Sequence, residues 1–149
     1  MIRKATASDV LKIKPLIDPF VKQGLMLPRS LNSLYTFLRD FWVLDGENDI
    51  IGCCALSITW EDLGEIRTLA IRQQDQGKTN GTSLVNACIN EARGLGLKRL
   101  FTLTYVPSFF KRIGFSEVDK AELPHKIWAD CINCPYFPDC REVALMCYL

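Results

Sequence analysis

The segment from Gln73 to Thr82 is the part of the sequence best suited to binding an anion. It reads QQDQGKTNGT and leads directly into an amphipathic stretch. Glycines beside a helix N-terminus let backbone N–H groups approach an anion closely, and the unpaired amides and the helix dipole favour negative charge. The segment therefore predicts a cradle for pyrophosphate. It lacks the Walker and dinucleotide-binding patterns, however, and could instead be a structural turn between a strand and a helix.

A second group of chemically capable residues lies near the C-terminus. Cys131, Cys134 and Cys140, with His125 upstream, offer three thiols and one imidazole, which are the ligand types and number of a tetrahedral zinc site. The spacing is only loosely that of structural zinc sites, and two intervening prolines are equally typical of a braced loop that covers a functional site. We therefore expect free thiols and no metal, with zinc or a disulfide as the alternatives. No nucleophile motif surrounds the single histidine, which disfavours a cysteine hydrolase.

Composition limits both the size and the partners of the protein. A length of 149 residues with 48% hydrophobic content fits one compact domain over residues 1–149. Eighteen basic and 17 acidic residues give a net charge of +1, too little to attract a nucleic acid backbone or an anionic membrane. The longest mostly apolar stretch, Ile50 to Trp60, is far shorter than the roughly 20 residues that span a bilayer. Because the N-terminus also lacks a signal-peptide pattern, we expect a cytoplasmic protein.

Hydrophobic periodicity predicts the elements that hold these segments in place. A capping box formed by Thr6 and Asp9 predicts a first helix, which Pro15 and Pro19 should kink or end. The further predicted helices are residues 30–39, 79–93 and 107–112, and the predicted strands are residues 41–44, 50–60, 65–71, 98–104, 115–119 and 142–149. The strand-helix-strand unit predicts a parallel pair in the middle of the sheet, and the preceding hairpin predicts antiparallel strands. The fold class is therefore α/β with a mixed central sheet flanked by helices.

The same region carries a family resemblance. The run EIRTLAIRQQDQGKTNGTSLVNACINEARGLGLKRLFTLT resembles the core of the GNAT acetyltransferases, in which a strand, a Q/R-x-x-G-x-G/A turn and a helix bind the pyrophosphate of acetyl-coenzyme A. Gln76 and Gly81 match that pattern, and Thr79 stands at its middle glycine. The segment YVPSFFKRIGF is similar to the short helix and strand beside the reacting centre. The resemblance implies that acetyl-coenzyme A is the donor and that it is bound by Leu69, Ala70, Ile71, Gln76, Gly77, Lys78, Thr79, Asn80, Gly81, Thr82 and Phe110.

A narrower resemblance covers nearly the whole chain. The segments MLPRSLNSLYTFLRDFWV, EIRTLAI, YVPSFFKRIGF and LPHKIWADCINCPYFPDC together resemble the short single-domain amino-acid N-acetyltransferase of the N-acetylglutamate synthase type. That resemblance implies direct acetyl transfer to the α-amino group of a small amino acid, above all L-glutamate or L-glutamine, as the first step of arginine biosynthesis, and a homodimer. The alternatives are another amine or a protein as acceptor, and a regulatory module that binds acetyl-coenzyme A without catalysis.

Acetyl transfer to an amine requires a neutral amine, a polarised carbonyl and a stabilised leaving thiolate. Glu65 lies where the family often has its base, and strand alternation predicts that it shares one sheet face with Arg67, Leu69 and Ile71. It could instead only pair with a neighbouring cation. Many family members have a tyrosine acid where Phe110 stands here, so Tyr105 is the nearest phenol that could protonate the thiolate, unless it only packs against the coenzyme.

An acceptor with two carboxylates needs cations, and the arginine fork can meet a carboxylate with two parallel hydrogen bonds. Arg29, Arg67 and Lys126 are the predicted acceptor-binding residues. Arg29 falls in the segment between the first two helices, which binds the acceptor in the family, and Lys126 falls in the LPHK segment. Each of the three could instead be a solvated surface charge.

Overall fold

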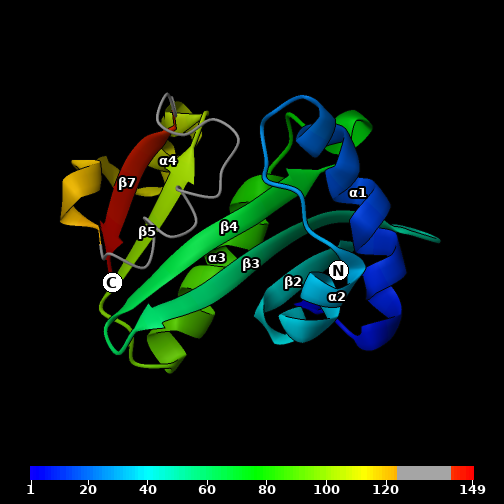
Figure 1. The fold of residues 1–149 in the computed structure, drawn as a ribbon, viewed down its shortest axis with the longest axis horizontal. Coiled ribbons are helices and arrows are strands. Elements are labelled where there is room, and N and C mark those ends of the chain that lie inside the picture. Colours follow the sequence, from blue (N-terminus) through cyan, green and yellow to red (C-terminus); the bar gives the residue numbers. More distant parts are fainter. Residues whose placement is uncertain (124–141) are drawn as a thin grey trace.

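A seven-stranded mixed sheet with helices on both faces forms the centre of the structure (Figure 1). The structure is a computed structural model that describes residues 1–123 and 142–149. The strands are β1 (Ile2–Lys4), β2 (Phe41–Asp45), β3 (Ile50–Trp60), β4 (Leu63–Ile71), β5 (Arg99–Thr104), β6 (Ser116–Glu117) and β7 (Val143–Tyr148). The helices are α1 (Val10–Lys22), α2 (Leu31–Thr36), α3 (Asn80–Gly94) and α4 (Pro107–Ile113), with short 3-10 turns η1 (Ala7–Asp9), η2 (Leu38–Asp40), η3 (Gln73–Asp75) and η4 (Lys120–Glu122). None of the helices in these two ranges is long and apolar enough to cross a bilayer.

The strand order is β1-β2-β3-β4-β5-β7-β6, and the directions match the sequence prediction. Strands β1 to β4 pair antiparallel, whereas β4 and β5 pair parallel. The parallel pairing is short, because it covers only Leu63–Glu65 of β4 and Arg99–Phe101 of β5. Figure 1 shows the two strands side by side at their starts and apart at their ends. This divergence opens the sheet at its middle.

Two main clusters of apolar side chains hold the helices against the sheet. Helix α3 packs on one face through the five positions predicted from its periodicity, all buried: Leu84, Val85, Cys88, Ile89 and Ala92. Helices α1 and α2 pack on the other face, where Ile13, Ile17 and Leu34 meet Phe41 and Val43. Burial of each large aliphatic side chain contributes about 1.5–3 kcal/mol. The sheet is therefore fixed between helices on its two faces.

Strand β4 contains a bulge at Thr68 that sequence reasoning did not foresee. Cys53 and Ala55 of β3 pair with Ala70 and Arg67 of β4, so β4 has one extra residue at this point. Thr68 has φ 54°, a left-handed conformation that is strained for a β-branched residue and costs about 1–3 kcal/mol. Such a bulge reverses which side chains face which side of the sheet.

The bulge overturns one prediction. Ile66 packs on the α3 face, and beyond the bulge Leu69 and Ile71 pack on that same face. Alternation before the bulge places Glu65 and Arg67 on the opposite face from Ile66. The prediction that Glu65, Arg67, Leu69 and Ile71 share one face was therefore wrong, since it assumed an unbroken strand.

Other differences arise at the ends of elements. Of the two predicted effects of the prolines, a kink or an end, the end does not occur, because helix α1 continues to Lys22 through both of them and their side chains lie exposed. Helix α2 ends at Thr36 and continues only as the turn η2, and β6 has two residues where five were predicted. Strand β1 was not predicted because its three residues carry no periodicity and depend on pairing with β2. The N-caps are as expected: Thr6 and Asp9 form a capping box, and Ser30 Oγ accepts from the Ser33 amide at 3.0 Å.

Candidate functional site

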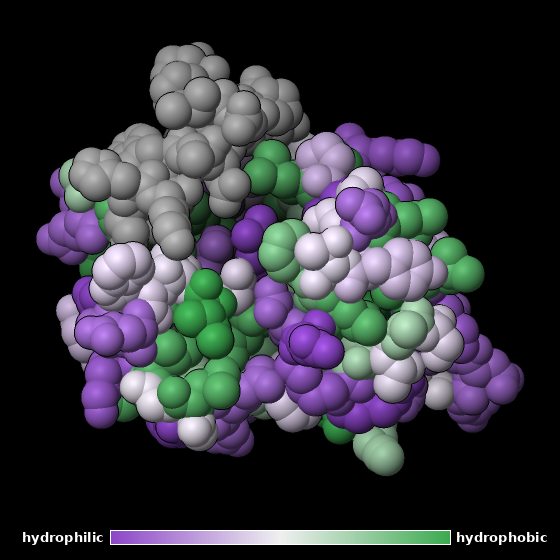
Figure 2. Space-filling model, turned by 60° about the horizontal axis from the view of Figure 1, so that its bottom comes forward, coloured by the Kyte–Doolittle hydropathy of each residue, from purple (hydrophilic) through white to green (hydrophobic). Residues whose placement is uncertain are grey.

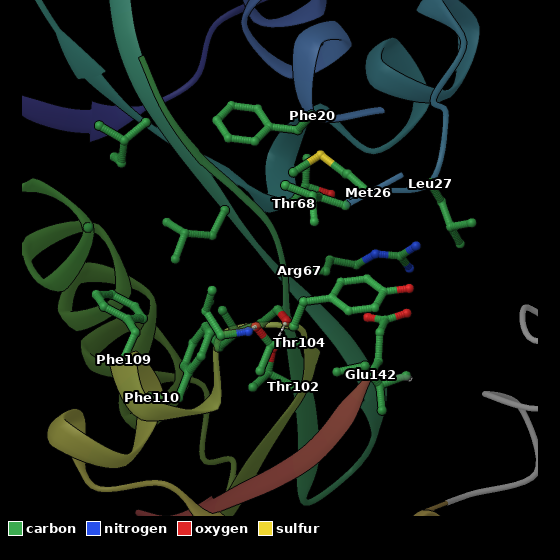
Figure 3. Close-up of a pocket in the computed structure, with 18 of the residues that line it drawn as sticks. Phe20, Met26, Leu27, Arg67, Thr68, Thr102, Thr104, Phe109, Phe110 and Glu142 are labelled. Atoms are coloured by element: carbon green, nitrogen blue, oxygen red, sulfur yellow. Dashed lines mark hydrogen bonds between the residues drawn. The ribbon is translucent and has the colours of Figure 1, made fainter. Parts of the chain in front are cut away.

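A cleft of about 1100 Å³ follows the divergence of β4 and β5. It is bordered by the segment between α1 and α2 on one side and by the starts of α3 and α4 on the other. Figure 3 shows Phe20, Met26 and Leu27 on the first side and Phe109 and Phe110 on the second. In Figure 2 the surface is hollowed near its centre, with hydrophilic residues between two hydrophobic groups. The predicted site residues that line this cleft are Arg29, Glu65, Arg67, Leu69, Ile71, Gln76, Gly77, Lys78, Gly81, Thr82, Tyr105 and Phe110.

The turn before helix α3 is held in shape by its own side chains. Gln76 Nε2 donates to the Ile71 carbonyl at 2.9 Å, and Asn80 Nδ2 donates to the Asp75 carbonyl at 3.1 Å. Gly77 has φ +77°, a conformation that glycine adopts without a Cβ penalty. Thr79, at the N-cap of α3, has φ −82° and ψ 6°, so a threonine fits there without strain.

The same turn has the geometry of an anion cradle. The first amides of a helix have no acceptor within the helix, and they combine with the positive end of the helix dipole. Gly81 keeps the first turn of α3 close to α4, because a Cβ there would lie 3.2 Å from Cζ of Phe109. Of the other residues predicted to bind the donor, Ala70 packs in the core under helix α1, and Thr79 and Asn80 shape the turn without lining the cleft.

Glu65 and Arg67 lie next to each other inside the cleft. The Glu65 Oε1 atom is 3.8 Å from Nη1 of Arg67, and the Glu65 side chain is only 15% exposed. Figure 3 shows Arg67 and Glu142 reaching into the same part of the cleft from β4 and from the start of β7. The structure therefore contains a carboxylate next to a cation at the place where the two strands separate, and the predicted pairing of Glu65 with a neighbouring cation is present.

Arg29 is a half-buried cation whose hydrogen-bond and ring contacts are all to neutral groups. Its Nη1 donates to Thr68 Oγ1 at 3.2 Å, and its Nη2 lies 3.5 Å from Ser33 Oγ. Its guanidinium carbon lies 5.1 Å from the Phe41 ring centre and 5.8 Å from that of Phe37. Burial, with the nearby charge of Arg67, lowers the pKa of Arg29. No carboxylate within the described ranges forms an ion pair with it, although the charges of Asp40 and Glu65 act on it from a greater distance.

Four further residues line this end of the cleft and were not predicted from the sequence to be site residues: Ser33, Phe37, Asp40 and Thr68. Burial raises the pKa of Asp40, and the charge of Arg29 opposes that shift. Ser33 and Phe37 fall three and seven residues after the helix cap Ser30, so the predicted helix placed them next to Arg29, a signal that could have been used. Nothing in the sequence marks Thr68, because its contact with Arg29 depends on the bulge.

The two aromatic positions near the predicted reacting centre have different environments. Phe110 is 3% exposed and packs edge-on against Phe109 and Phe115, with ring centres 5.0 and 5.3 Å away. Tyr105, after the end of β5, is less buried and lines the cleft. Among the residues that the structure describes, the phenol that lines the cleft is therefore that of Tyr105.

Five predicted residues cannot be compared with the structure. Lys126 and the candidate zinc ligands His125, Cys131, Cys134 and Cys140 lie outside the described residues. Within the described ranges, no group of three or more metal-ligating side chains could hold a metal ion. The other cysteines, Cys53, Cys54, Cys88 and Cys147, are free thiols.

The known sequences that this chain resembles are acetyltransferases. Residues 16–115 match the model of the acetyltransferase (GNAT) family. An uncharacterised N-acetyltransferase of Chlorobaculum tepidum is 36% identical over 145 residues, 97% of this chain and 94% of that one. An amino-acid acetyltransferase of Mycobacterium tuberculosis is 38% identical over 80% of this chain and 70% of its own length. One from Neisseria meningitidis is 38% identical over 83% of this chain, but this match spans only 29% of that longer protein.

Solved structures share the fold over the full length of the chain. The N-acetylglutamate synthase of Neisseria gonorrhoeae, complexed with coenzyme A and N-acetylglutamate, superposes with a TM-score of 0.91 at 32% identity, over 35% of its own chain. A protein of Mycobacterium tuberculosis in complex with coenzyme A superposes with a TM-score of 0.84 at 31% identity, over 99% of its chain. The fold of this chain is thus shared with coenzyme A complexes.

Proposed function

Because the chain belongs to the acetyltransferase (GNAT) family, we propose that it transfers the acetyl group of acetyl-coenzyme A to the α-amino group of a small amino acid, L-glutamate or L-glutamine. The observation that carries this proposal is a single cleft with an amide-lined turn at one end and the half-buried guanidinium of Arg29 at the other. The turn suits a pyrophosphate, and the guanidinium suits a carboxylate. A donor and an acceptor can therefore meet between β4 and β5.

The donor is assigned to the α3 side of the cleft. Gln76, Gly77, Lys78, Gly81 and Thr82 line this part, where backbone amides can hold the two phosphates. The diverging edges of β4 and β5 expose backbone N–H and C=O groups to an extended arm that carries amides. Acetyl-coenzyme A has both features, and the similar structures named above are coenzyme A complexes.

The reaction is assigned to the residues where the strands separate. The neutral amine attacks the thioester carbonyl, the C–N bond forms, the C–S bond breaks and the coenzyme leaves as a thiolate. We assign Glu65 as the base that takes the proton of the amine, because its carboxylate lines the cleft next to Arg67. Tyr105 is assigned as the proton donor to the thiolate, since its phenol lines the cleft.

The acceptor is assigned to the α1–α2 side of the cleft. Arg29 and Arg67 provide two cations there, and Lys126 would add a third. Two or three cations suit an amino acid with one or two carboxylates better than a polyamine, because like charges repel. Relatives named amino-acid acetyltransferases support this class of acceptor. A role in arginine biosynthesis and a homodimer complete the proposal and rest on the resemblance, and a cytoplasmic location is proposed with them.

One experiment tests the proposal against its alternatives. Release of free thiol from acetyl-coenzyme A is measured with free amino acids, peptides and polyamines as separate acceptors. We expect turnover with glutamate or glutamine and little with the other classes. Turnover only with peptides or polyamines would replace the acceptor, and coenzyme binding without any turnover would replace the enzyme with a binding module.

A further inference from the structure

The bulge in β4 brings a strained residue into contact with the acceptor end of the cleft. Thr68 is the only residue other than glycine with a positive φ within residues 1–123 and 142–149. A β-branched residue persists in this conformation only where its surroundings hold it there. Two contacts do so: Arg29 Nη1 donates to Thr68 Oγ1 at 3.2 Å, and Cys53 Sγ donates to the Thr68 carbonyl at 3.5 Å. The strain is therefore located at a residue that contacts the cation of the site.

We propose that Thr68 is a positioning residue, whose hydroxyl holds the Arg29 guanidinium in the orientation that meets the carboxylate of the acceptor. The inference rests on the proposed function, because it concerns the same acceptor site. Without the bulge, alternation would turn Thr68 to the α3 face and away from Arg29. The bulge thus has a consequence for specificity: it adds a neutral hydrogen-bond acceptor beside the guanidinium.

The Thr68 hydroxyl is uncharged, so its hydrogen bond with Arg29 orients the guanidinium without neutralising it. A carboxylate in place of the Thr68 hydroxyl would orient Arg29 equally well but would also neutralise it and compete with the substrate. The hydroxyl accepts one N–H and leaves other donors of the guanidinium for an anion. The aromatic rings of Phe37 and Phe41 further limit its rotation. Arg29 is therefore fixed in direction by neutral contacts, and in the described part of the chain Asp40 and Glu65 act on its charge without forming an ion pair with it.

The test compares two substitutions at this position with a matched control. Thr68→Val removes the hydroxyl and keeps the shape of the side chain, so we expect the KM for the acceptor to rise about tenfold. The KM for acetyl-coenzyme A and kcat should change less than about twofold. Thr68→Ser keeps the hydroxyl and should retain the wild-type acceptor KM. Thr36→Val, at an exposed position of α2, is the control and should leave all three constants unchanged.

A third substitution separates positioning from a structural role. Thr68→Gly removes the hydroxyl and also relieves the backbone strain, so it should raise the acceptor KM while leaving the unfolding midpoint equal or higher. A lower midpoint with an unchanged acceptor KM would overturn the inference. Arg29→Ala distinguishes the two proposals. If it raises the acceptor KM and Thr68→Val does not, only the role of Thr68 is wrong. If Arg29→Ala has no effect, the acceptor site itself is misplaced.

Discussion

Glu65 and Arg67 are two residues apart on β4, and their Oε1 and Nη1 atoms are 3.8 Å apart at the point where β4 leaves β5. The distance is long for a hydrogen bond but short enough for the charges to interact. The two side chains therefore interact through their charges and not through a hydrogen bond. A carboxylate in this state can accept a proton from an incoming amine, directly or through a water molecule.

Glu65→Gln should therefore reduce turnover in a pH-dependent way. We expect kcat to fall about a hundredfold near neutral pH, because the variant lacks a base for the protonated fraction of the amine. The loss should shrink as the pH approaches the pKa of the amine, since the amine then loses its proton to solvent. The measurement is the pH profile of kcat from about pH 6 to about pH 10. Glu117→Gln, at an exposed ion pair, is the control, and an unchanged profile in Glu65→Gln would remove Glu65 from the mechanism.

Tyr105→Phe should reduce kcat about tenfold if the phenol protonates the departing thiolate. The expected loss is smaller than for Glu65, because a thiolate with a pKa near 8.5 is a moderately good leaving group without protonation. The measurement is kcat at saturating concentrations of both substrates. Full activity in this variant would show that no dedicated acid is needed and that Tyr105 only packs against the coenzyme.

The turn before α3 allows a comparison between two glycines with the same backbone conformation. Gly77 has φ +77° and Gly96 has φ +83°, and a Cβ at either would meet nothing within 4 Å. Alanine at either position should therefore lower the free energy of unfolding by about 1–2 kcal/mol. Only Gly77→Ala should raise the KM for acetyl-coenzyme A, because only Gly77 lines the cleft. Equal KM values in the two variants would place the pyrophosphate elsewhere.

The lowered pKa of Asp9 makes the free energy of unfolding depend on pH. Hydrogen bonds from Arg3, at 2.7 and 2.9 Å, lower the pKa of this buried carboxyl from 3.8 to about 2. Because the pKa of Asp9 is lower in the folded than in the unfolded state, the charged carboxylate stabilises the fold by about 2 kcal/mol at pH values above the unfolded-state pKa. This stabilisation is lost as the pH falls through the folded-state pKa of about 2. Asp9→Asn should therefore destabilise the protein at pH 7 (roughly neutral) but not at strongly acidic pH. Denaturant unfolding at several pH values measures the difference.

The control for this prediction is Asp18→Asn, which should change the free energy of unfolding much less. Asp18 pairs with Lys14 at 2.7 Å, one helical turn apart on α1, with 40% of its side chain exposed. Surface pairs of this kind contribute about 0.3–0.5 kcal/mol. A difference between wild type and Asp9→Asn that stays constant down to the lowest pH would contradict the assignment of the stabilisation to the Asp9 charge.

Cys53 should be chemically inert in the folded protein. Its side chain is fully buried, and burial raises the pKa of the thiol to about 12. At pH 8, on the order of one molecule in ten thousand would carry the reactive thiolate, even before access is considered. Alkylation followed by peptide mass spectrometry should therefore label Cys53 only in denaturant. The half-buried Cys147 provides the comparison, and rapid labelling of native Cys53 would show that β3 opens locally.

Sequence reasoning was most successful where a pattern depends on neighbouring residues. The hairpin, the strand-helix-strand unit and the buried face of α3 all follow from local periodicity and turn residues. The turn from Gln73 to Thr82, predicted from its composition to bind an anion, lies beside the cleft in the structure. The bulge could not be predicted, because Thr68 is a typical strand residue and its left-handed backbone depends on contacts with β3 and Arg29. Asp40 became a site residue only through tertiary structure, whereas the helical spacing from Arg29 could have identified Ser33.

The short strands at the two ends of the sheet bear on how copies of this chain can associate. Strand β1 has three residues, including Arg3 and Lys4, and β6 has two, Ser116 and Glu117. Short, charged edge strands present few unpaired backbone groups and discourage a second sheet from pairing with them. The edges are therefore protected against edge-to-edge aggregation. A homodimer formed through the described residues would therefore favour helices, loops or a sheet face over a continuous intermolecular sheet.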